Sequence, residues 1–295
     1  MKWIPRIHSN PIRKVLGEAT SQIMMPTVLI VTGASRGFGR ALATAFAAAA
    51  STESNKKLSA VLVARDKSGL EKTREQMLAR QDGSRVECVE CDLGELSTLE
   101  DRWTREVEGR LSQVVNDNED GAHLIFLNNA GSLGTLAPCT EQTFASMQSS
   151  FDFNVTSCCY QSSRIAKWCS DNPRVKRTTI VNVSSLAAVQ AFETWGVYCA
   201  GKSARDMYHA TMALEYKSKE EFKTMNYAPG PMDTDMQKTI RESEGCDLGT
   251  REYFIDAKAK GTLVDPAKSA EKLASLVIAN TFASGAHIDF YDKTE

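Results

Sequence analysis

A glycine-rich turn between a buried strand and a helix constrains the fold of this chain more than any other feature. Residues 27–32 read TVLIVT, a continuous apolar run rich in β-branched residues, and this pattern predicts a strand buried on both faces. Gly33, Gly37 and Gly39 follow, and the alanine-rich segment 40–50 predicts a helix directly after them. Glycines let the backbone turn sharply and approach a pyrophosphate, which the N–H groups of a helix N-terminus then bind. In this context the turn predicts dinucleotide binding rather than a plain tight turn.

The rest of the chain continues the alternation of strands and helices. Further strands are predicted at 58–63, 86–90, 123–127, 178–183, 222–227 and 287–291. Helices are predicted at 67–80, 96–111, 144–169, 197–216 and 268–280. Repeated β-α units imply parallel strands joined by right-handed crossovers. The predicted fold class is therefore α/β: a single Rossmann-type doubly wound domain over 26–295, with a parallel seven-stranded sheet and helices on both faces.

Two segments fall outside this pattern. Segment 1–25 carries four basic residues, one acid and two prolines: Lys2, Arg6, Arg13, Lys14, Glu18, Pro5 and Pro11. We expect a disordered extension there rather than a mitochondrial presequence, because the prolines oppose a long amphipathic helix. Segment 233–262 is polar and breaks the β-α alternation. We expect a substrate lid there rather than a passive surface excursion, because ligands of open α/β sheets bind beyond the carboxyl ends of the strands.

The composition excludes several classes of partner. The formal net charge is -2 with 24% charged residues, so nothing favours binding to nucleic acid or to an anionic membrane. No apolar run approaches the ~20 residues that a membrane span requires. Cys88 and Cys91 form a C-x-x-C, but no further ligands complete a zinc set, so we expect structural thiols and no metal site. Eight unpaired cysteines suit the reducing cytoplasm.

The residue type at the end of the second predicted strand indicates which dinucleotide would bind. An acid at this position bonds the ribose 2′-hydroxyl of NAD, whereas this strand ends at Arg65, whose guanidinium suits the 2′-phosphate of NADP. Arg36, within the turn, can approach the same phosphate. Asp66 is discordant, but an acid is also favoured where a helix begins. We therefore expect NADPH, with two merely solvated arginines as the alternative.

Three residues suggest acid-base chemistry in the same cleft. Tyr198 and Lys202 lie four apart on a predicted helix and share one face, so the ammonium is expected to lower the pKa of the phenol. Such a pair alone occurs by chance. Ser185, however, ends a predicted strand thirteen residues upstream and can hydrogen-bond a substrate carbonyl oxygen. Asn154, on the preceding helix, is a candidate for holding a water that supplies protons to Lys202.

These motifs together resemble the short-chain dehydrogenase/reductase family. They run in family order: 32–39 (TGASRGFG), 128–131 (NNAG), Asn154, 182–185 (NVSS), Tyr198-x-x-x-Lys202 and Pro229-Gly230. A narrower resemblance, to members of this family that reduce pterins, covers nearly the whole chain after Pro26. It is carried by 128–134 (NNAGSLG), 198–207 (YCAGKSARDM), 227–237 (YAPGPMDTDMQ) and 284–292 (SGAHIDFYD). The extension before Pro26 is not a feature of that group.

The narrower resemblance implies NADPH-dependent reduction of side-chain ketones of pterins, the closing step of tetrahydrobiopterin synthesis. It implies this cofactor-binding set: Gly33, Ala34, Ser35, Arg36, Gly37, Phe38, Gly39, Ala64, Arg65, Asp92, Leu93, Asn129, Ala130, Gly131, Lys202, Met232, Asp233, Thr234, Asp235, Met236 and Gln237. It implies contacts of Ser185, Tyr198 and Gly230 with the substrate, and a homodimer formed through the helices that hold Asn154 and Tyr198.

The resemblance also implies that Asp289 anchors the pterin. One carboxylate can accept hydrogen bonds from a pterin amino group and the neighbouring ring N–H. By itself the sequence favours an exposed acid on an edge strand. Trp195 and Met236 are candidates to pack on the ring, although ordinary core packing explains them equally well. Two other functions compete: a broad NADPH-dependent diketone reductase that lacks the pterin anchor, and a non-catalytic NADP-binding sensor, against which the intact Ser185, Tyr198 and Lys202 argue.

Overall fold

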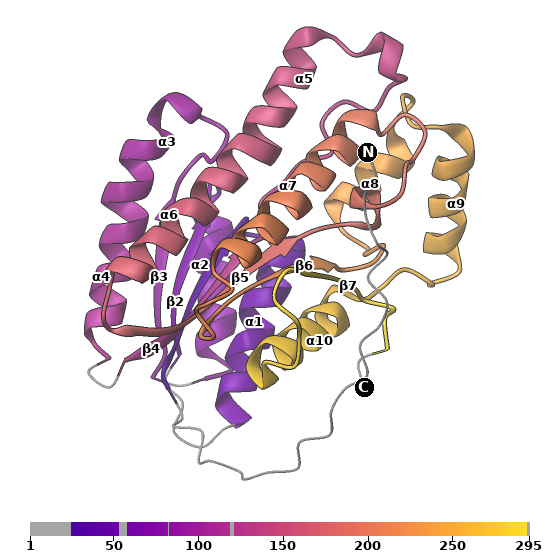
Figure 1. Cartoon of the computed structure of the whole chain (residues 1–295). Coiled ribbons are helices and arrows are strands. Elements are labelled where there is room, and N and C mark those ends of the chain that lie inside the picture. Colours follow the sequence, from indigo (N-terminus) through magenta and orange to yellow (C-terminus); the bar gives the residue numbers. More distant parts are fainter. Residues whose placement is uncertain (1–24, 53–57, 82, 119–120, 294–295) are drawn as a thin grey trace, which may run out of the picture.

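Seven parallel strands form one sheet in the order β3-β2-β1-β4-β5-β6-β7. The computed structural model describes residues 25–52, 58–81, 83–118 and 121–293 (Figure 1). The strands are β1 (Thr27–Thr32), β2 (Leu58–Ala64), β3 (Arg85–Glu90), β4 (Ala122–Asn128), β5 (Val175–Val183), β6 (Phe222–Ala228) and β7 (Ala286–Asp289). All seven predicted strands are confirmed, as is the parallel α/β fold. The predictions for segment 1–25 concern residues that lie, except for Met25, outside the described part of the chain.

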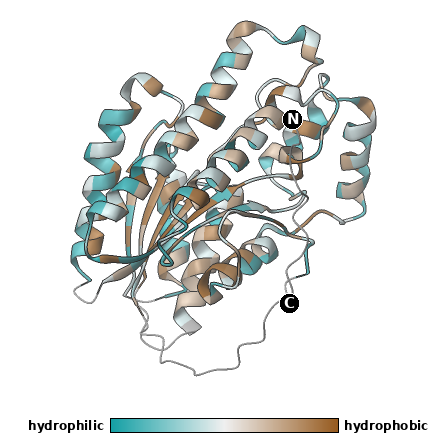
Figure 2. Cartoon of the chain, viewed as in Figure 1, coloured by the Kyte–Doolittle hydropathy of each residue, from teal (hydrophilic) through white to brown (hydrophobic). Residues whose placement is uncertain are grey.

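Helices cover both faces of the sheet. One face is covered by α1 (Gly37–Thr52), α2 (Lys67–Leu78) and α10 (Pro266–Ala279). The other is covered by α3 (Leu96–Arg102), α4 (Gly109–Asn116), α6 (Cys158–Asp171) and α7 (Gly196–Glu215). The two faces bury separate apolar clusters; Phe46 and Leu273 belong to the first, and Trp103 and Ile165 to the second. Figure 2 shows the apolar strands enclosed between helices whose outer surfaces are hydrophilic.

Two long predicted helices contain π-helical turns. The predicted helix 144–169 consists of α5 (Phe144–Phe151), the π-turn η3 (Asp152–Ser157) and α6. The predicted helix 96–111 likewise consists of α3, the π-turn η1 (Trp103–Glu108) and α4. Short 3-10 turns lie at η2 (Cys139–Glu141) and η4 (Leu186–Ala188). A π-turn often marks a functional position, and η3 contains Asn154.

The polar segment 233–262 forms two helices, α8 (Asp235–Glu242) and α9 (Leu248–Ala259). They lie together beyond the carboxyl end of the sheet (Figure 1). A third apolar cluster joins them to the start of α7 through Trp195, Tyr198, Ile240 and Phe254. The segment is therefore packed on the rest of the domain. Among the described residues, no helix is both long and apolar enough to cross a membrane.

Candidate active site

A cleft of about 1230 Å³ lies at the carboxyl edge of the sheet. Parallel strands bring all their carboxyl ends to this edge, and the strand order reverses between β1 and β4, where open α/β sheets bind ligands. The cleft extends from the turn after β1 to the end of β7. Nearly every residue proposed for the site from the sequence lines it. The exceptions are Ala34, which is buried beneath the turn, Asp233, which is paired to Lys258, and Asn154.

The turn after β1 has the shape that a pyrophosphate requires. Gly33 has a φ of 65°, and a Cβ at Gly39 would lie 2.2 Å from the carbonyl oxygen of Gly33, so neither position accepts another residue without strain. The first turn of α1 carries no acidic residue. Thr73 braces the turn: its hydroxyl donates to the carbonyl of Ala34 at 2.8 Å and accepts from Arg40 Nε at 3.0 Å. The backbone N–H groups at this end of α1 therefore fit the phosphates of a dinucleotide.

Two arginines line the cleft near the carboxyl ends of β1 and β2. Arg36 forms an exposed ion pair with Asp235 at 3.0 Å, and Arg65 lies 3.7 Å from Asp92. Both guanidinium groups remain largely exposed. Asp66, the residue that appeared to oppose NADP binding, caps α2 by accepting a hydrogen bond from the backbone of Gly69 at 3.0 Å. This cap confirms the alternative reading of Asp66 as a helix start.

A buried arginine that we did not anticipate from the sequence holds the loop after β4. Arg205 donates to the carbonyl oxygens of Asn128 at 2.8 Å and Ala130 at 3.0 Å, and to the side chain of Asn182 at 2.7 Å. It is fully buried. Arg205 lies seven residues after Tyr198 and three after Lys202, so all three share one helix face. That spacing is the signal by which the sequence could have revealed it.

Tyr198 and Ser185 meet at the centre of the cleft. Ser185 lies two residues after the end of β5, and its hydroxyl accepts a hydrogen bond from the backbone of Ala187 at 3.1 Å. Burial raises the pKa of Tyr198 to about 12, while a hydrogen bond with Ser185 and the charge of Arg205 oppose that rise. Tyr198 is therefore a protonated phenol at neutral pH, and its hydroxyl lies next to a serine hydroxyl.

The expected lowering of the tyrosine pKa by Lys202 is not found. The Nζ atom of Lys202 lies 5.7 Å from the ring centroid of Tyr198 and donates to the carbonyl oxygen of Val183 at 2.7 Å. Burial also holds the pKa of Lys202 well below its ordinary value, with the charge of Arg205 acting in the same direction. The spacing places the pair on one face as predicted, but burial is the largest influence on the pKa of each residue.

Asn154 has its side-chain amide engaged with the loop after Gly131. Its Oδ1 accepts from the backbone of Ser132 at 2.9 Å, and its Nδ2 donates to the carbonyl of Ser132 at 3.0 Å and to Ser150 Oγ at 3.1 Å. These contacts fix the loop against η3. The role of Asn154 in proton supply remains a prediction.

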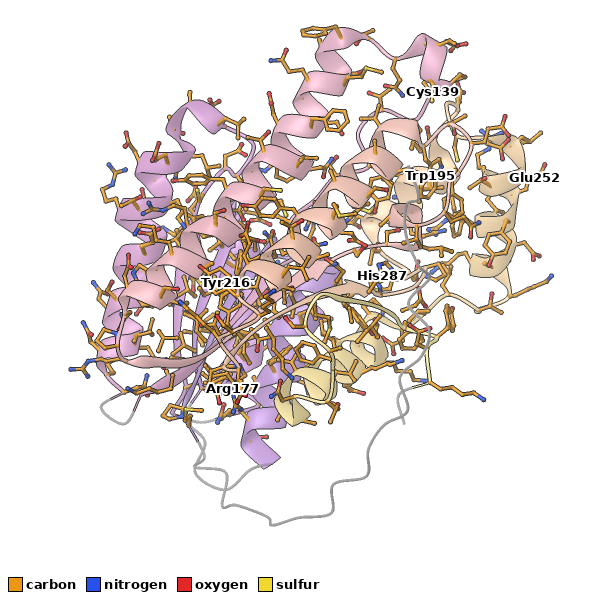
Figure 3. The ribbon with its side chains drawn as sticks, in the orientation of Figure 1. Cys139, Arg177, Trp195, Tyr216, Glu252 and His287 are labelled. Atoms are coloured by element: carbon orange, nitrogen blue, oxygen red, sulfur yellow. The ribbon has the colours of Figure 1, made fainter. Side chains whose placement is uncertain are left out.

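The far end of the cleft combines aromatic rings with a carboxylate. The indole of Trp195 packs edge-on against Tyr198, with centroids 5.7 Å apart, and stacks on Phe254 at 6.3 Å. Asp289 lines the cleft at the end of β7, and its Oδ1 accepts from the backbone of Tyr291 at 2.8 Å. In Figure 3, Trp195 lies on the side of the molecule occupied by α8 and α9, and His287 lies at β7.

Two buried polar groups in the cleft have no hydrogen-bonding partner among the described residues. They are the indole nitrogen of Trp195 and the side-chain amide of Gln237. Buried polar groups are ordinarily paired, and unpaired ones in a cleft suit contact with a ligand. The cleft therefore fits a dinucleotide together with a small polar substrate.

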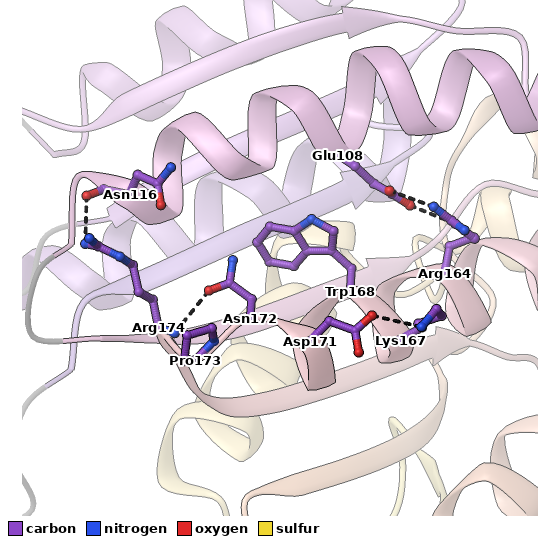
Figure 4. A pocket seen from close by; sticks show the side chains of 9 residues that line it. All are labelled: Glu108, Asn116, Arg164, Lys167, Trp168, Asp171, Asn172, Pro173 and Arg174. Atoms are coloured by element: carbon purple, nitrogen blue, oxygen red, sulfur yellow. Dashed lines mark hydrogen bonds and ion pairs between the residues drawn. The ribbon is translucent and has the colours of Figure 1, made fainter.

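A second hollow, of about 420 Å³, lies between α4 and α6 (Figure 4). Its charged side chains are already paired: Arg164 with Glu108 at 2.8 Å and Lys167 with Asp171 at 2.9 Å. Cys88 and Cys91 pack on opposite faces of the sheet, as the strand periodicity predicts, and burial raises the pKa of both thiols. Among the described residues, no group of histidine, cysteine and acidic side chains has the arrangement of a metal site.

Comparison with known proteins agrees with this geometry. The family model for short chain dehydrogenases matches residues 27–245. The chain belongs to the short-chain dehydrogenase family and is a nicotinamide-dependent oxidoreductase.

Within that family the chain is similar to sepiapterin reductases. The enzyme of Rattus norvegicus is 38% identical over 90% of this chain and 96% of its own length. The enzyme of Meriones unguiculatus is 39% identical over 90% of this chain and 97% of its own length. A benzil reductase of Bacillus cereus is 29% identical over 87% of this chain and 96% of its own length. The structure of levodione reductase superposes with a TM-score of 0.71 at 20% identity, covering 90% of this chain and 95% of the other, and shows the shared fold.

Proposed function

We propose that this chain reduces the side-chain ketones of pterins with NADPH, converting sepiapterin to dihydrobiopterin and, on a tetrahydropterin ketone, closing the synthesis of tetrahydrobiopterin. The observation that carries this proposal is one cleft that holds the Ser185–Tyr198 pair and, at its far end, the carboxylate of Asp289. The similarity to sepiapterin reductases over 90% of the chain supports the same substrate class.

NADPH would be held by the turn 33–39 at its pyrophosphate, by Arg65 and Arg36 at its 2′-phosphate, and by Asp92 and Leu93 at its adenine. When bound, the nicotinamide supplies hydride to the ketone carbon. The exposed guanidinium groups of Arg36 and Arg65, and the use of Asp66 as a helix cap, support NADP rather than NAD.

The chain's own residues supply the oxygen-binding and proton-donating half of the reaction. Ser185 would hydrogen-bond the ketone oxygen and stabilise the charge that develops on it. Tyr198, kept protonated by burial, would donate its proton to that oxygen. Lys202, held by the carbonyl oxygen of Val183, would provide a hydrogen-bonding contact for the nicotinamide ribose.

Asp289 would orient the pterin by accepting from its amino group and ring N–H. One carboxylate oxygen is engaged by Tyr291, and the other makes no hydrogen bond among the described residues. The apolar faces of Trp195 and Met236 would contact the ring. We further propose that segment 233–262 acts as a substrate lid, since Met236, Tyr253 and Phe254 form one wall of the cleft.

We also propose a homodimer formed through α5, α6 and α7. The exposed apolar side chains of Met207 and Leu214, which lie seven residues or about two turns apart on one face of α7, support this assignment. A cytoplasmic location is proposed because all eight cysteines are free thiols, which suits a reducing compartment.

A broad diketone reductase is the second candidate, and the similarity to a benzil reductase favours it. NADPH oxidation should be followed with sepiapterin and with a panel of small diketones, for the unaltered chain and Asp289→Ala. The pterin proposal expects Asp289→Ala to raise the KM for sepiapterin at least tenfold and to change diketone reduction less than threefold, the scale of one lost charge-assisted contact. Equal effects on both substrates would favour the diketone reductase. No turnover of any carbonyl would favour a non-catalytic NADP-binding protein.

A further inference from the structure

We propose that Asp206 is a positioning residue that fixes the separation between the ketone-binding end of the cleft and Asp289. Asp206 lies on α7, four residues after Lys202. Its Oδ1 accepts hydrogen bonds from Ser184 Oγ at 2.6 Å and from Asn182 Nδ2 at 2.9 Å. Its Oδ2 lies 2.6 Å from His287 Nδ1. One carboxylate therefore joins α7 to both β5 and β7.

Two hydrogen-bonding partners of Asp206 lie close in sequence to the residues at the two ends of the proposed substrate site. Ser184 immediately precedes Ser185, which would hold the ketone oxygen. His287 lies two residues before Asp289 on β7, and residues two apart on a strand point to the same face. Both His287 and Asp289 line the cleft. Holding the imidazole of His287 therefore also holds the strand face from which Asp289 projects.

β7 is the shortest strand of the sheet and lies at its edge. It has four residues, all only partly buried, and it pairs only with β6. After Asp289 the chain leaves the sheet, where Lys272 donates to the carbonyl of Phe290 at 2.8 Å. The hydrogen bond from His287 to Asp206 holds the chain on the N-terminal side of Asp289. The hydrogen bond from Lys272 to Phe290 holds it on the C-terminal side. Short edge strands with few partners open locally at low cost.

This inference rests on the proposed function, since it concerns a substrate that touches both ends of the cleft at once. A pterin held at Asp289 must also present its side-chain ketone to Ser185 and Tyr198. A small diketone needs only Ser185 and Tyr198. Loosening the link should therefore weaken pterin binding and leave reduction of the small diketone unchanged.

The experiment compares His287→Leu with His287→Asn. Leucine removes the donor to Asp206, whereas the amide nitrogen of asparagine can occupy the place of Nδ1 and restore it. His287 lies on a partly exposed edge strand, so both variants are expected to fold. KM and kcat are measured with NADPH and either sepiapterin or a small diketone, and amide hydrogen exchange is measured in 286–292.

We expect His287→Leu to raise the KM for sepiapterin about tenfold, because a displaced Asp289 loses part of its charge-assisted hydrogen bonding to the pterin. Its kcat and its diketone kinetics should stay within twofold of the unaltered chain, and exchange in 286–292 should accelerate. His287→Asn should stay within threefold in every measurement. An unchanged KM and unchanged exchange in His287→Leu, or equal defects in both variants, would overturn the role of Asp206. An unaltered chain that cannot reduce sepiapterin would contradict the proposed function instead, and the exchange measurement would still support or overturn the link.

Discussion

The ammonium group of Lys202 donates a hydrogen bond to the carbonyl oxygen of Val183 at 2.7 Å, and Val183 lies two residues before the serine of the proposed catalytic pair. This contact anchors the last residue of β5 to the helix that carries Tyr198. It also accounts for a lysine that is almost entirely buried. A buried ammonium costs free energy unless it is hydrogen-bonded, so this contact is part of what keeps Lys202 beneath the cleft.

Replacing Lys202 with methionine keeps the packing volume and removes the amine. We expect kcat to fall on the order of 100-fold, because the site loses a buried hydrogen-bond donor positioned to contact the nicotinamide ribose. Steady-state kinetics with NADPH and sepiapterin provide the measurement. Lys167→Met, which removes an exposed lysine paired to Asp171, is the control and should retain full activity. A kcat within threefold of the unaltered value in Lys202→Met would exclude the proposed role.

Arg65 is expected to determine the preference for NADPH. Arg65→Ala removes a guanidinium that can bond the 2′-phosphate, so the KM for NADPH should rise by roughly 10- to 100-fold while the KM for NADH stays nearly constant. Arg74→Ala, which removes an arginine paired to Glu71 on α2, serves as the control. If Arg65→Ala raised the KM for NADPH and the KM for NADH by the same factor, Arg65 would not contact the 2′-phosphate.

Arg205 is expected to stabilise both the fold and the cofactor loop. Arg205→Met leaves the three oxygens of Asn128, Ala130 and Asn182 without their guanidinium donor, and unsatisfied buried groups cost about 1–3 kcal/mol each. We expect the free energy of unfolding to fall by roughly 3 kcal/mol or more, and NADPH to bind less tightly. Denaturant unfolding and a fluorescence titration measure the two effects. Arg174→Met, which removes an exposed arginine, should change neither; equal stability of the two variants would contradict this account.

His209 should make the protein sensitive to acid. Burial lowers the pKa of His209 to about 4, and its ring nitrogens lie 2.7 Å from the carbonyl of Arg205 and 2.8 Å from Ser162 Oγ. The unfolded chain therefore binds a proton before the folded chain as the pH falls. The stability that the neutral histidine contributes is complete above pH ~6.5 and is lost between pH ~6.5 and ~4, by roughly 3 kcal/mol.

The free energy of unfolding, measured from pH 7 to pH 4.5 for the unaltered chain and for His209→Gln, tests this linkage. Glutamine does not titrate, so the loss of stability with falling pH should be shallower in the variant. Parallel curves for the two proteins would mean that His209 does not titrate on unfolding.

The sequence predicted the sheet well because each strand is a local pattern. Residues 27–32 form β1 with the predicted bounds, since an apolar β-branched run that ends in glycine has few alternatives. The π-turn at Asp152–Ser157 was not predicted, because a single turn of six residues is too short to show a period of its own within a long helical pattern. The helices α8 and α9 were not predicted either, because both are short and largely polar.

Nearly all the site residues named from the sequence line the cleft. Ser185, Tyr198 and Lys202 were named from a strand end and a helical spacing, whereas most of the cofactor-binding set was named from the family resemblance. What could not be predicted depends on contacts between distant parts of the chain. Arg205 reaches Asn128 across 77 positions, and Asp206 reaches His287 across 81. The high pKa of Tyr198 depends on burial by α8, α9 and the loop after β4, and no spacing of tyrosine and lysine encodes that burial.

The most direct test of the central claim is the Tyr198→Phe variant, with NADPH affinity and single-turnover sepiapterin reduction measured on the same preparation. Phenylalanine keeps the ring that packs against Trp195 and removes only the hydroxyl that is proposed to donate the proton. We predict an NADPH dissociation constant within twofold of the unaltered protein and a reduction rate at least ~100-fold lower, the scale of general acid catalysis. Near-normal reduction by Tyr198→Phe would contradict the assignment of Tyr198 as the proton donor.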